Sequence, residues 1–107
     1  RKAGVDVRQL AEIITKSSGN SLAINVFPRI LDGQYGFSFT LDLATKDVSL
    51  AHQLARDVAA PARIAEMVEA VLKRGQAQGW GQEGCTVAIR ILEQFSGVEL
   101  GAPEQGA

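Results

Sequence analysis

The residues best suited to chemistry in this sequence are an adjacent cation and anion, Lys46 and Asp47. A segment that alternates aromatic and small residues, and that includes Phe39, leads up to them. Exposed charges most often form only a solvated pair, so the pair alone does not establish a site. Two features favour a functional site here. The aromatic approach is too apolar for an ordinary exposed loop, and Leu43 and Leu50 share a helical face with Lys46, so this lysine is expected to border a buried surface rather than open water.

Three other residues are weaker candidates. His52 is the single histidine and has no Ser, Cys or Asp at motif spacing, so a nucleophilic triad is not indicated, and a surface or satisfied residue is the simpler interpretation. Cys85 is the single cysteine, which excludes an intrachain disulfide and, with one histidine, a zinc-type cluster; no metal site is expected. Cys85 is interpreted as a small buried residue rather than a reactive thiol. Trp80 is either a packing anchor or a contact for a partner domain.

The glycines of Gly79-x-Gly81-x-x-Gly84 match the letters of a dinucleotide-binding fingerprint. That fingerprint requires a preceding strand and an acidic residue about twenty positions later, at the end of a second strand. The hydrophobic periodicity here predicts a helix before the glycines and another after them. The match is therefore rejected.

The amino-acid composition limits the classes of protein to which this chain can belong. The 107 residues favour one domain, and the hydrophobic fraction of 46% is ordinary for a soluble globular chain. A net charge of −1 predicts no nucleic-acid or anionic-membrane partner, and no apolar run is long enough to cross a bilayer. Without a signal-peptide pattern, a cytoplasmic protein is expected. The start at Arg1 rather than Met suggests a piece of something larger.

The elements that must position these residues are read from periodicity and capping. Residues 4–17 are predicted to form a helix, with Asp6 as N-cap and Gln9 completing a capping box. Residues 22–27 form a short second helix, which Pro28 either ends or kinks while the apolar face continues. We interpret residues 35–39 as an extended loop.

The longest helix is predicted over residues 40–59. The alternation of residues 35–43 also fits a strand, but no second strand is available to pair with it. Asp42 and Lys46 are four residues apart in the order that supports a helix by roughly 0.3 kcal/mol.

Two further helices are predicted over residues 61–78 and 84–96. Pro61 suits a first helical position, and Gly97 suits a left-handed C-terminal cap. The residues predicted to face inward are Ile64, Met67, Val68, Val71, Leu72, Val87, Ala88, Ile91, Leu92 and Phe95. The segment 101–107 is expected to be disordered. The result is an all-α bundle of about five helices.

The order of these features resembles the C-terminal, all-helical domain of the β-hydroxyacid dehydrogenases, the family of 3-hydroxyisobutyrate, tartronate semialdehyde and 6-phosphogluconate dehydrogenases. The matching pieces are Ala3-Gly4-Val5-Asp6, Ser17-Ser18-Gly19-Asn20-Ser21, Phe39-(x)6-Lys46-Asp47-Val48-x-Leu50-Ala51, Pro61 and Gly79-Trp80-Gly81. Their order and spacing cover roughly residues 3–96.

The resemblance implies a partner and a reaction. A Rossmann domain outside this chain would bind NAD or NADP, and residues 1–100 would be a domain that closes over it and forms a homo-oligomer. Hydride would pass between the nicotinamide and a small β-hydroxyacid. Lys46 would reach the cofactor, Asp47 would support catalysis by orienting a catalytic lysine outside this chain, and Phe39 would line the pocket.

The resemblance has one departure and leaves one alternative. The family commonly has Asp before its last helix, where this chain has Gly84, so that helix start should be looser by a few tenths of a kcal/mol. The family's long central helix is also absent here, so the remaining helices should expose apolar surface and self-associate or swap helices to cover it. The alternative is a stand-alone helical interaction or dimerisation module without catalysis.

Overall fold

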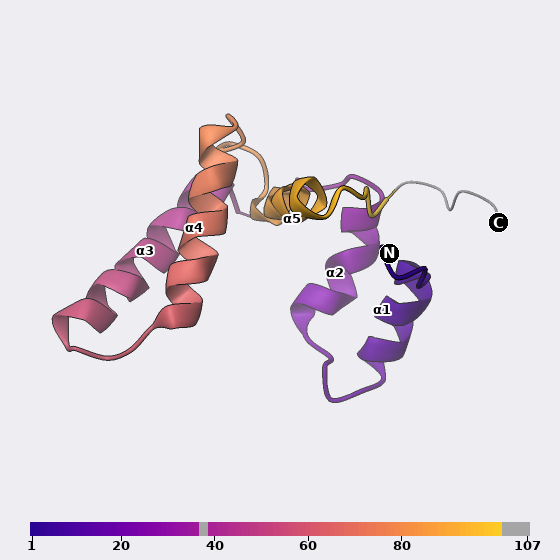
Figure 1. Ribbon diagram of the computed structural model, residues 1–107, viewed down its shortest axis with the longest axis horizontal. Helices are drawn as coiled ribbons and strands as arrows, with labels where there is room; N and C mark the ends of the chain where they lie inside the picture. The colour runs from indigo at the N-terminus through magenta and orange to yellow at the C-terminus, as the bar shows by residue number, and fades with distance from the viewer. Residues whose placement is uncertain (37–38, 102–107) are drawn as a thin grey trace. The chain divides into compact units, whose positions relative to one another are not determined.

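The computed structural model describes residues 1–36 and 39–101. Within these ranges the chain contains five α-helices and one 3-10 helix, and no β-strand (Figure 1). The predicted all-α fold of about five helices is confirmed. The chain forms two compact units. One comprises Arg1–Gln34 and the chain from Leu92 onward, and the other comprises Tyr35–Ile91.

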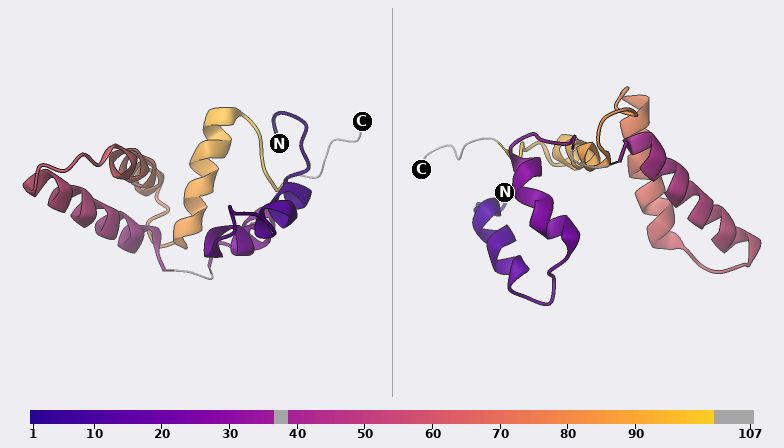
Figure 2. Two further views of the ribbon diagram at one scale, coloured as in Figure 1. Left: turned by 90° about the horizontal axis from the view of Figure 1, so that it is seen from below. Right: turned by 180° about the vertical axis from the view of Figure 1, so that it is seen from behind.

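In the first unit, α1 (Val7–Thr15) packs against α2 (Leu22–Leu31), as Figure 2 also shows. Asp6 is confirmed as the N-cap of α1, because its Oδ1 accepts hydrogen bonds from the backbone N–H groups of Arg8 and Gln9 at 2.9 and 3.1 Å. The helix begins later than predicted. Gly4 has φ +81°, a left-handed conformation that a continuing α-helix does not contain.

The helix α2 passes through Pro28 and ends at Leu31, four residues beyond the predicted 22–27. Ser21 caps its start by accepting a hydrogen bond from Ile24 N at 3.4 Å. Leu31 is buried and Ile30 is half-buried, so the apolar face continues past the proline. Packing of this face offsets the hydrogen bond that Pro28 cannot donate.

In the second unit, α3 (Leu41–Asp57) and α4 (Arg63–Ala77) lie side by side and form a helical hairpin (Figures 1 and 2). The predicted helix over residues 40–59 is therefore confirmed, with Thr40 as N-cap: its Oγ1 accepts a hydrogen bond from Leu43 N at 3.2 Å. The spacing of Asp42 and Lys46 favoured this helix, but the two side chains do not pair in the part of the chain described, because the Asp42 carboxylate accepts hydrogen bonds from glutamine side chains instead.

The core of this unit lies where the hairpin meets the 3-10 helix η1 (Cys85–Ala88). Its buried members are Leu41, Ala44, Leu72 and Val87. Gly75 on α4 allows close packing here, because a Cβ at this position would lie 2.8 Å from Cδ2 of Leu41. The start of α3 is thus the best buried part of the longest helix.

The predicted inward face of α4 is mostly wrong. Ile64 and Met67 are 78% and 70% exposed and Val68 is also exposed, whereas Leu72 is buried as predicted. The helix turns Glu69 and Leu72 toward α3, which leaves a second apolar face uncovered by the described residues. Pro61 is not at a first helical position either, since α4 begins at Arg63.

The last predicted helix, 84–96, is divided into η1 and α5 (Ile89–Ser96). Val87 and Ile91 are fully buried as predicted, but Leu92 and Phe95 are exposed, so the inward prediction for these two is wrong. Gly97 has φ +67° and donates its N–H to Glu93 O at 2.8 Å, which confirms the left-handed cap.

Candidate functional site

Lys46 and Asp47 lie in the second turn of α3, and both are exposed. Neither side chain forms a hydrogen bond or ion pair with any residue in the described ranges. Most other charged side chains in this hairpin have a partner, such as Glu69 with Lys73. The two candidate residues are thus available to an outside ligand.

The backbone of Phe39 is held by a hydrogen bond, whereas its side chain is exposed. Its carbonyl accepts a hydrogen bond from Cys85 N at 2.8 Å, while the residue is 54% exposed. It lies directly before the N-cap Thr40 and therefore close in the chain to Lys46. Phe37 and Ser38, the middle of the predicted extended loop, lie outside the described residues.

The first residues of α3 are hydrogen-bonded to the loop that follows α4. Leu41 N donates to Glu83 O at 2.8 Å, and Asp42 N donates to Gly81 O at 2.9 Å. Thr40 and Gly84 form an isolated antiparallel bridge. These bonds come from residues just before and at the start of the helix, so they fix the approach to Lys46.

Gly84, where the family resemblance led us to expect Asp, is buried. No side chain caps η1 at this position. A Cβ on Gly84 would overlap the carbonyl oxygen of Tyr35, so the backbones of the two segments are in direct contact. The start of η1 therefore has no capping side chain and is instead packed closely against the backbone of Tyr35.

An apolar surface borders the charged pair, but it is exposed, so the prediction that Lys46 borders a buried surface is wrong for the part of the chain described. Leu43, Leu50 and Leu54 are all exposed, with Leu50 at 59%, and they recur at spacings of seven and four residues. This spacing places them on one side of α3 with Asp47 between them and Lys46 at the edge. The described residues leave this side uncovered.

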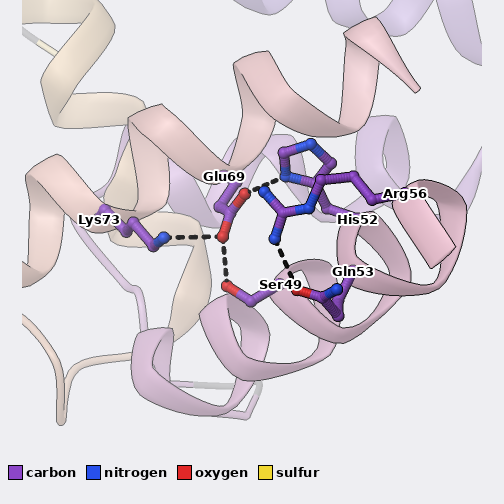
Figure 3. A network of polar contacts seen from close by, with 6 residues as sticks. All are labelled: Ser49, His52, Gln53, Arg56, Glu69 and Lys73. Atoms are coloured by element: carbon purple, nitrogen blue, oxygen red, sulfur yellow. Dashed lines mark hydrogen bonds and ion pairs between the residues drawn. The ribbon is translucent and has the colours of Figure 1, made fainter. Parts of the chain in front are cut away.

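A second polar cluster, which the sequence analysis missed, joins α3 to α4 (Figure 3). The Glu69 carboxylate accepts a hydrogen bond from Ser49 Oγ at 2.7 Å and lies 2.5 Å from His52 Nδ1. Lys73 Nζ forms an ion pair with the same carboxylate at 2.8 Å. Hydrogen bonds from Lys73, then Ser49 and His52, lower the pKa of Glu69 from 4.5 to about 2.

This cluster is not a nucleophilic triad. In a triad the serine donates to the histidine, whereas Ser49 and His52 both contact Glu69. His52 is therefore a satisfied residue, as its isolation in the sequence suggested. The spacings 49/52 and 69/73 each fit one helical face, but only the register of α3 against α4 brings them together.

Trp80 and Cys85 both pack against the core of the second unit. The Arg90 guanidinium lies 4.5 Å from the centroid of the Trp80 ring, a cation–π arrangement. Of the two interpretations of Trp80, packing anchor is the one that this contact supports. The three glycines around it follow α4 rather than a strand, as expected from rejecting the dinucleotide fingerprint.

Within residues 1–36 and 39–101, no group of three or more His, Cys, Asp and Glu side chains is placed to hold a metal ion. None of the helices in these ranges has the length and apolar character that a transmembrane span requires.

Comparison with known proteins gives the same family as the motifs. Residues 1–92 match the family described as NAD-binding of NADP-dependent 3-hydroxyisobutyrate dehydrogenase. The chain is 32% identical over 101 residues to 2-(hydroxymethyl)glutarate dehydrogenase of Eubacterium barkeri, covering 92% of this chain and 34% of that protein. It is 28% identical over 107 residues to L-threonate dehydrogenase of Haemophilus influenzae, covering 99% of this chain and 34% of that protein.

A solved structure supports the fold. The crystal structure of 3-hydroxyisobutyrate dehydrogenase from Salmonella typhimurium superposes with a TM-score of 0.77 at 24% identity, over 84% of this chain and 32% of that one. The chain spans about a third of the length of these relatives. Because the family match extends over most of the sequence, this chain belongs to the family of NAD-binding domains of NADP-dependent 3-hydroxyisobutyrate dehydrogenase.

Proposed function

We propose that this chain is the helical domain of an NAD(P)-dependent oxidoreductase that interconverts a small β-hydroxyacid and its carbonyl form. The observation that carries the proposal is that Lys46 is exposed, pairs with no described residue, and lies on a helix whose start is hydrogen-bonded to a loop and follows directly on the exposed Phe39. The relatives are named for oxidation of hydroxyacids, 2-(hydroxymethyl)glutarate and L-threonate, which supports the substrate class.

The residues present fit a nicotinamide dinucleotide. Such a cofactor carries anionic phosphates and an apolar ring, and it would supply the hydride acceptor. Lys46 presents an ammonium without a competing carboxylate in the described chain, and Phe39 presents an apolar ring. In the proposal Lys46 binds the cofactor and Phe39 excludes water from the region of hydride transfer.

Asp47 has a supporting role in this proposal. Its carboxylate, adjacent to Lys46 and equally exposed, would accept hydrogen bonds from a catalytic lysine and hold the orientation of that lysine. The catalytic lysine and the Rossmann domain belong to the part of the enzyme outside this chain. A chain that spans a third of its relatives is consistent with this division.

The proposal extends to the assembly and location of the protein. Residues 1–100 would act as one domain that closes over the cofactor. The uncovered apolar faces of α3 and α4 would be buried in a homo-oligomer. A single cysteine suits a reducing compartment, so the cytoplasm is the proposed location.

The test is a kinetic comparison in the complete enzyme that carries this chain. Lys46→Ala should raise the KM for NAD or NADP by roughly 10- to 100-fold, as loss of a charge-assisted hydrogen bond predicts. Lys16→Ala, which removes an exposed lysine at the C-cap of α1, is the control and should leave the KM unchanged. An unchanged KM in Lys46→Ala would contradict the proposed role.

Activity of the isolated piece provides a second test. The 107-residue chain should show no turnover with NAD or NADP and a panel of 3-hydroxyacids, because the catalytic lysine and the nucleotide-binding domain are elsewhere. Turnover by this chain would contradict the division of labour proposed here. A complete protein without dehydrogenase activity would instead favour a non-catalytic interaction module.

A further inference from the structure

Asp42, in the first turn of α3, is engaged by two side chains from outside its own helix. Its Oδ1 accepts a hydrogen bond from Gln76 Nε2 on α4 at 2.7 Å, and its Oδ2 accepts one from Gln82 Nε2 in the following loop at 2.9 Å. Asp42 is half-buried, and hydrogen bonds to an ionised carboxylate are stronger than those between neutral groups. One carboxylate therefore links three segments.

The same loop is bound to the backbone on both sides of Asp42. The N–H of Asp42 itself donates to Gly81 O, and Cys85 N donates to the carbonyl of Phe39. Gly81 lies so close that a Cβ on it would overlap the Asp42 carboxylate. The loop from Gly81 to Cys85 is thus seated against the segment from Phe39 to Asp42.

We propose that Asp42 is a positioning residue of the candidate site, which fixes Phe39 relative to Lys46 and Asp47. The two charged residues are held by the helix that contains them. Phe39 precedes the helix, and its carbonyl is hydrogen-bonded to Cys85 in the loop from Gly81 to Cys85. The position of its backbone therefore depends on this loop, which Asp42 holds through Gln82. The effect on catalysis rests on the proposed function. The hydrogen bonds of the Asp42 carboxylate with Gln76 and Gln82, called the clamp below, can be tested separately.

The first test measures amide hydrogen exchange in the 107-residue chain. In Asp42→Ala, the N–H groups of Leu41 and Cys85, which bind across the clamp, should exchange roughly 10- to 100-fold faster. Asp42→Asn should stay within about 3-fold of the parent chain, because Oδ1 still accepts from Gln76 and the Gln82 amide can rotate to accept from the new amide.

Glu66→Ala is the matched control. Glu66 is also an acid in the first turn of a helix, but it is exposed and forms no hydrogen bond or ion pair with a described residue. Loss of its helix-dipole interaction acts only at the start of α4, so this variant should leave exchange at Leu41 and Cys85 unchanged. Equal exchange at Leu41 and Cys85 in both variants would overturn the inference.

The second test measures steady-state kinetics in the complete enzyme. Asp42→Ala should lower kcat, because a displaced Phe39 no longer excludes water from the region of hydride transfer, and should leave the KM for NAD or NADP near that of the parent enzyme, because Lys46 is held by its own helix; Asp42→Asn should restore kcat. A purely stabilising role would lower the unfolding temperature without changing kcat. If Lys46→Ala has no effect on the KM, the proposed function fails, while the exchange result still decides whether the clamp exists.

If Asp42→Ala does not fold, Gly81→Ala is a second variant that tests the same contact. The added methyl group should displace the Asp42 carboxylate and reproduce the faster exchange at Leu41 and Cys85. Parent-like exchange in this variant would count against the clamp.

Discussion

The imidazole of His52 on α3 lies 2.5 Å from the Glu69 carboxylate on α4, and both side chains are largely buried (Figure 3). With the bonds from Ser49 and Lys73, this contact satisfies the only buried acid in the described part of the hairpin. A buried carboxylate needs such partners, because water no longer solvates it. The cluster therefore adds polar contacts that hold α3 against α4 beside the apolar core.

The stability of the second unit should fall in acid. The pKa of Glu69 is lowered in the folded chain from 4.5 to about 2, chiefly by its hydrogen bond from Lys73. A lowered folded-state pKa means that Glu69 contributes its full stabilisation above about pH 4.5 and loses it as the pH falls toward 2. Urea unfolding at a series of pH values, followed by the fluorescence of Trp80, measures this loss.

Glu69→Gln provides the control for the acid effect. The variant should be less stable at neutral pH, since the ionised partner of Lys73 and His52 is removed. Its stability should also vary less than that of the parent chain between pH 4.5 and 2, the interval between the two pKa values. An unchanged pH dependence would show that other groups cause the acid effect.

Leu41→Ala should strongly destabilise the second unit. Leu41 is 0% exposed and packs with Leu72 and Val87, so its truncation should cost about 2–5 kcal/mol in the free energy of unfolding. Leu43→Ala, two residues further along α3 and exposed, should cost less than about 1 kcal/mol. Denaturant titration measures both, and equal losses would contradict the placement of the core.

Gly84→Ala should destabilise the chain although it adds only one methyl group. The new Cβ would overlap the Tyr35 carbonyl, and relieving the overlap should cost about 1–3 kcal/mol. Gly36→Ala is the comparison, because a Cβ there has no atom within 4 Å, and its stability should change little. Thermal unfolding of both variants tests the contact.

The isolated chain should self-associate through its uncovered apolar faces. Met67 on α4 is 70% exposed and Leu50 on α3 is 59% exposed. Sedimentation velocity should therefore show oligomers that shift toward monomer in a Leu50→Glu/Met67→Glu variant. A monomeric parent chain at high concentration would exclude this association.

Local signals explain how much of the fold the sequence could predict. Asp6 and Gly97 act within four residues of their own positions, so the caps were recognisable without a structure. The long helix was recognisable by periodicity, and Lys46 and Asp47 could be placed on it, because both lie on one continuous element. The family resemblance drew on the same local pieces.

Features that depend on pairs of distant segments were not predictable in this way. The exposed face of α4, which carries Met67, is as hydrophobic as a core face, so hydrophobicity alone could not show which face meets α3. The contact of His52 with Glu69 depends on helix register, and that of Gly84 with Tyr35 on a loop returning to an earlier segment.

The sequence by itself thus determined most of the helices and the caps at Asp6 and Gly97, because short-range hydrogen bonds and helical spacing govern them, and it placed Lys46 and Asp47 on one helix. Only the tertiary structure decided which apolar faces are covered, where Glu69 finds its partners and how Asp42 meets Gln76 and Gln82. These outcomes depend on the packing of residues far apart in the chain, 17 positions for His52 with Glu69 and 40 for Asp42 with Gln82, which side-chain shape and close contact settle only when the chain is folded.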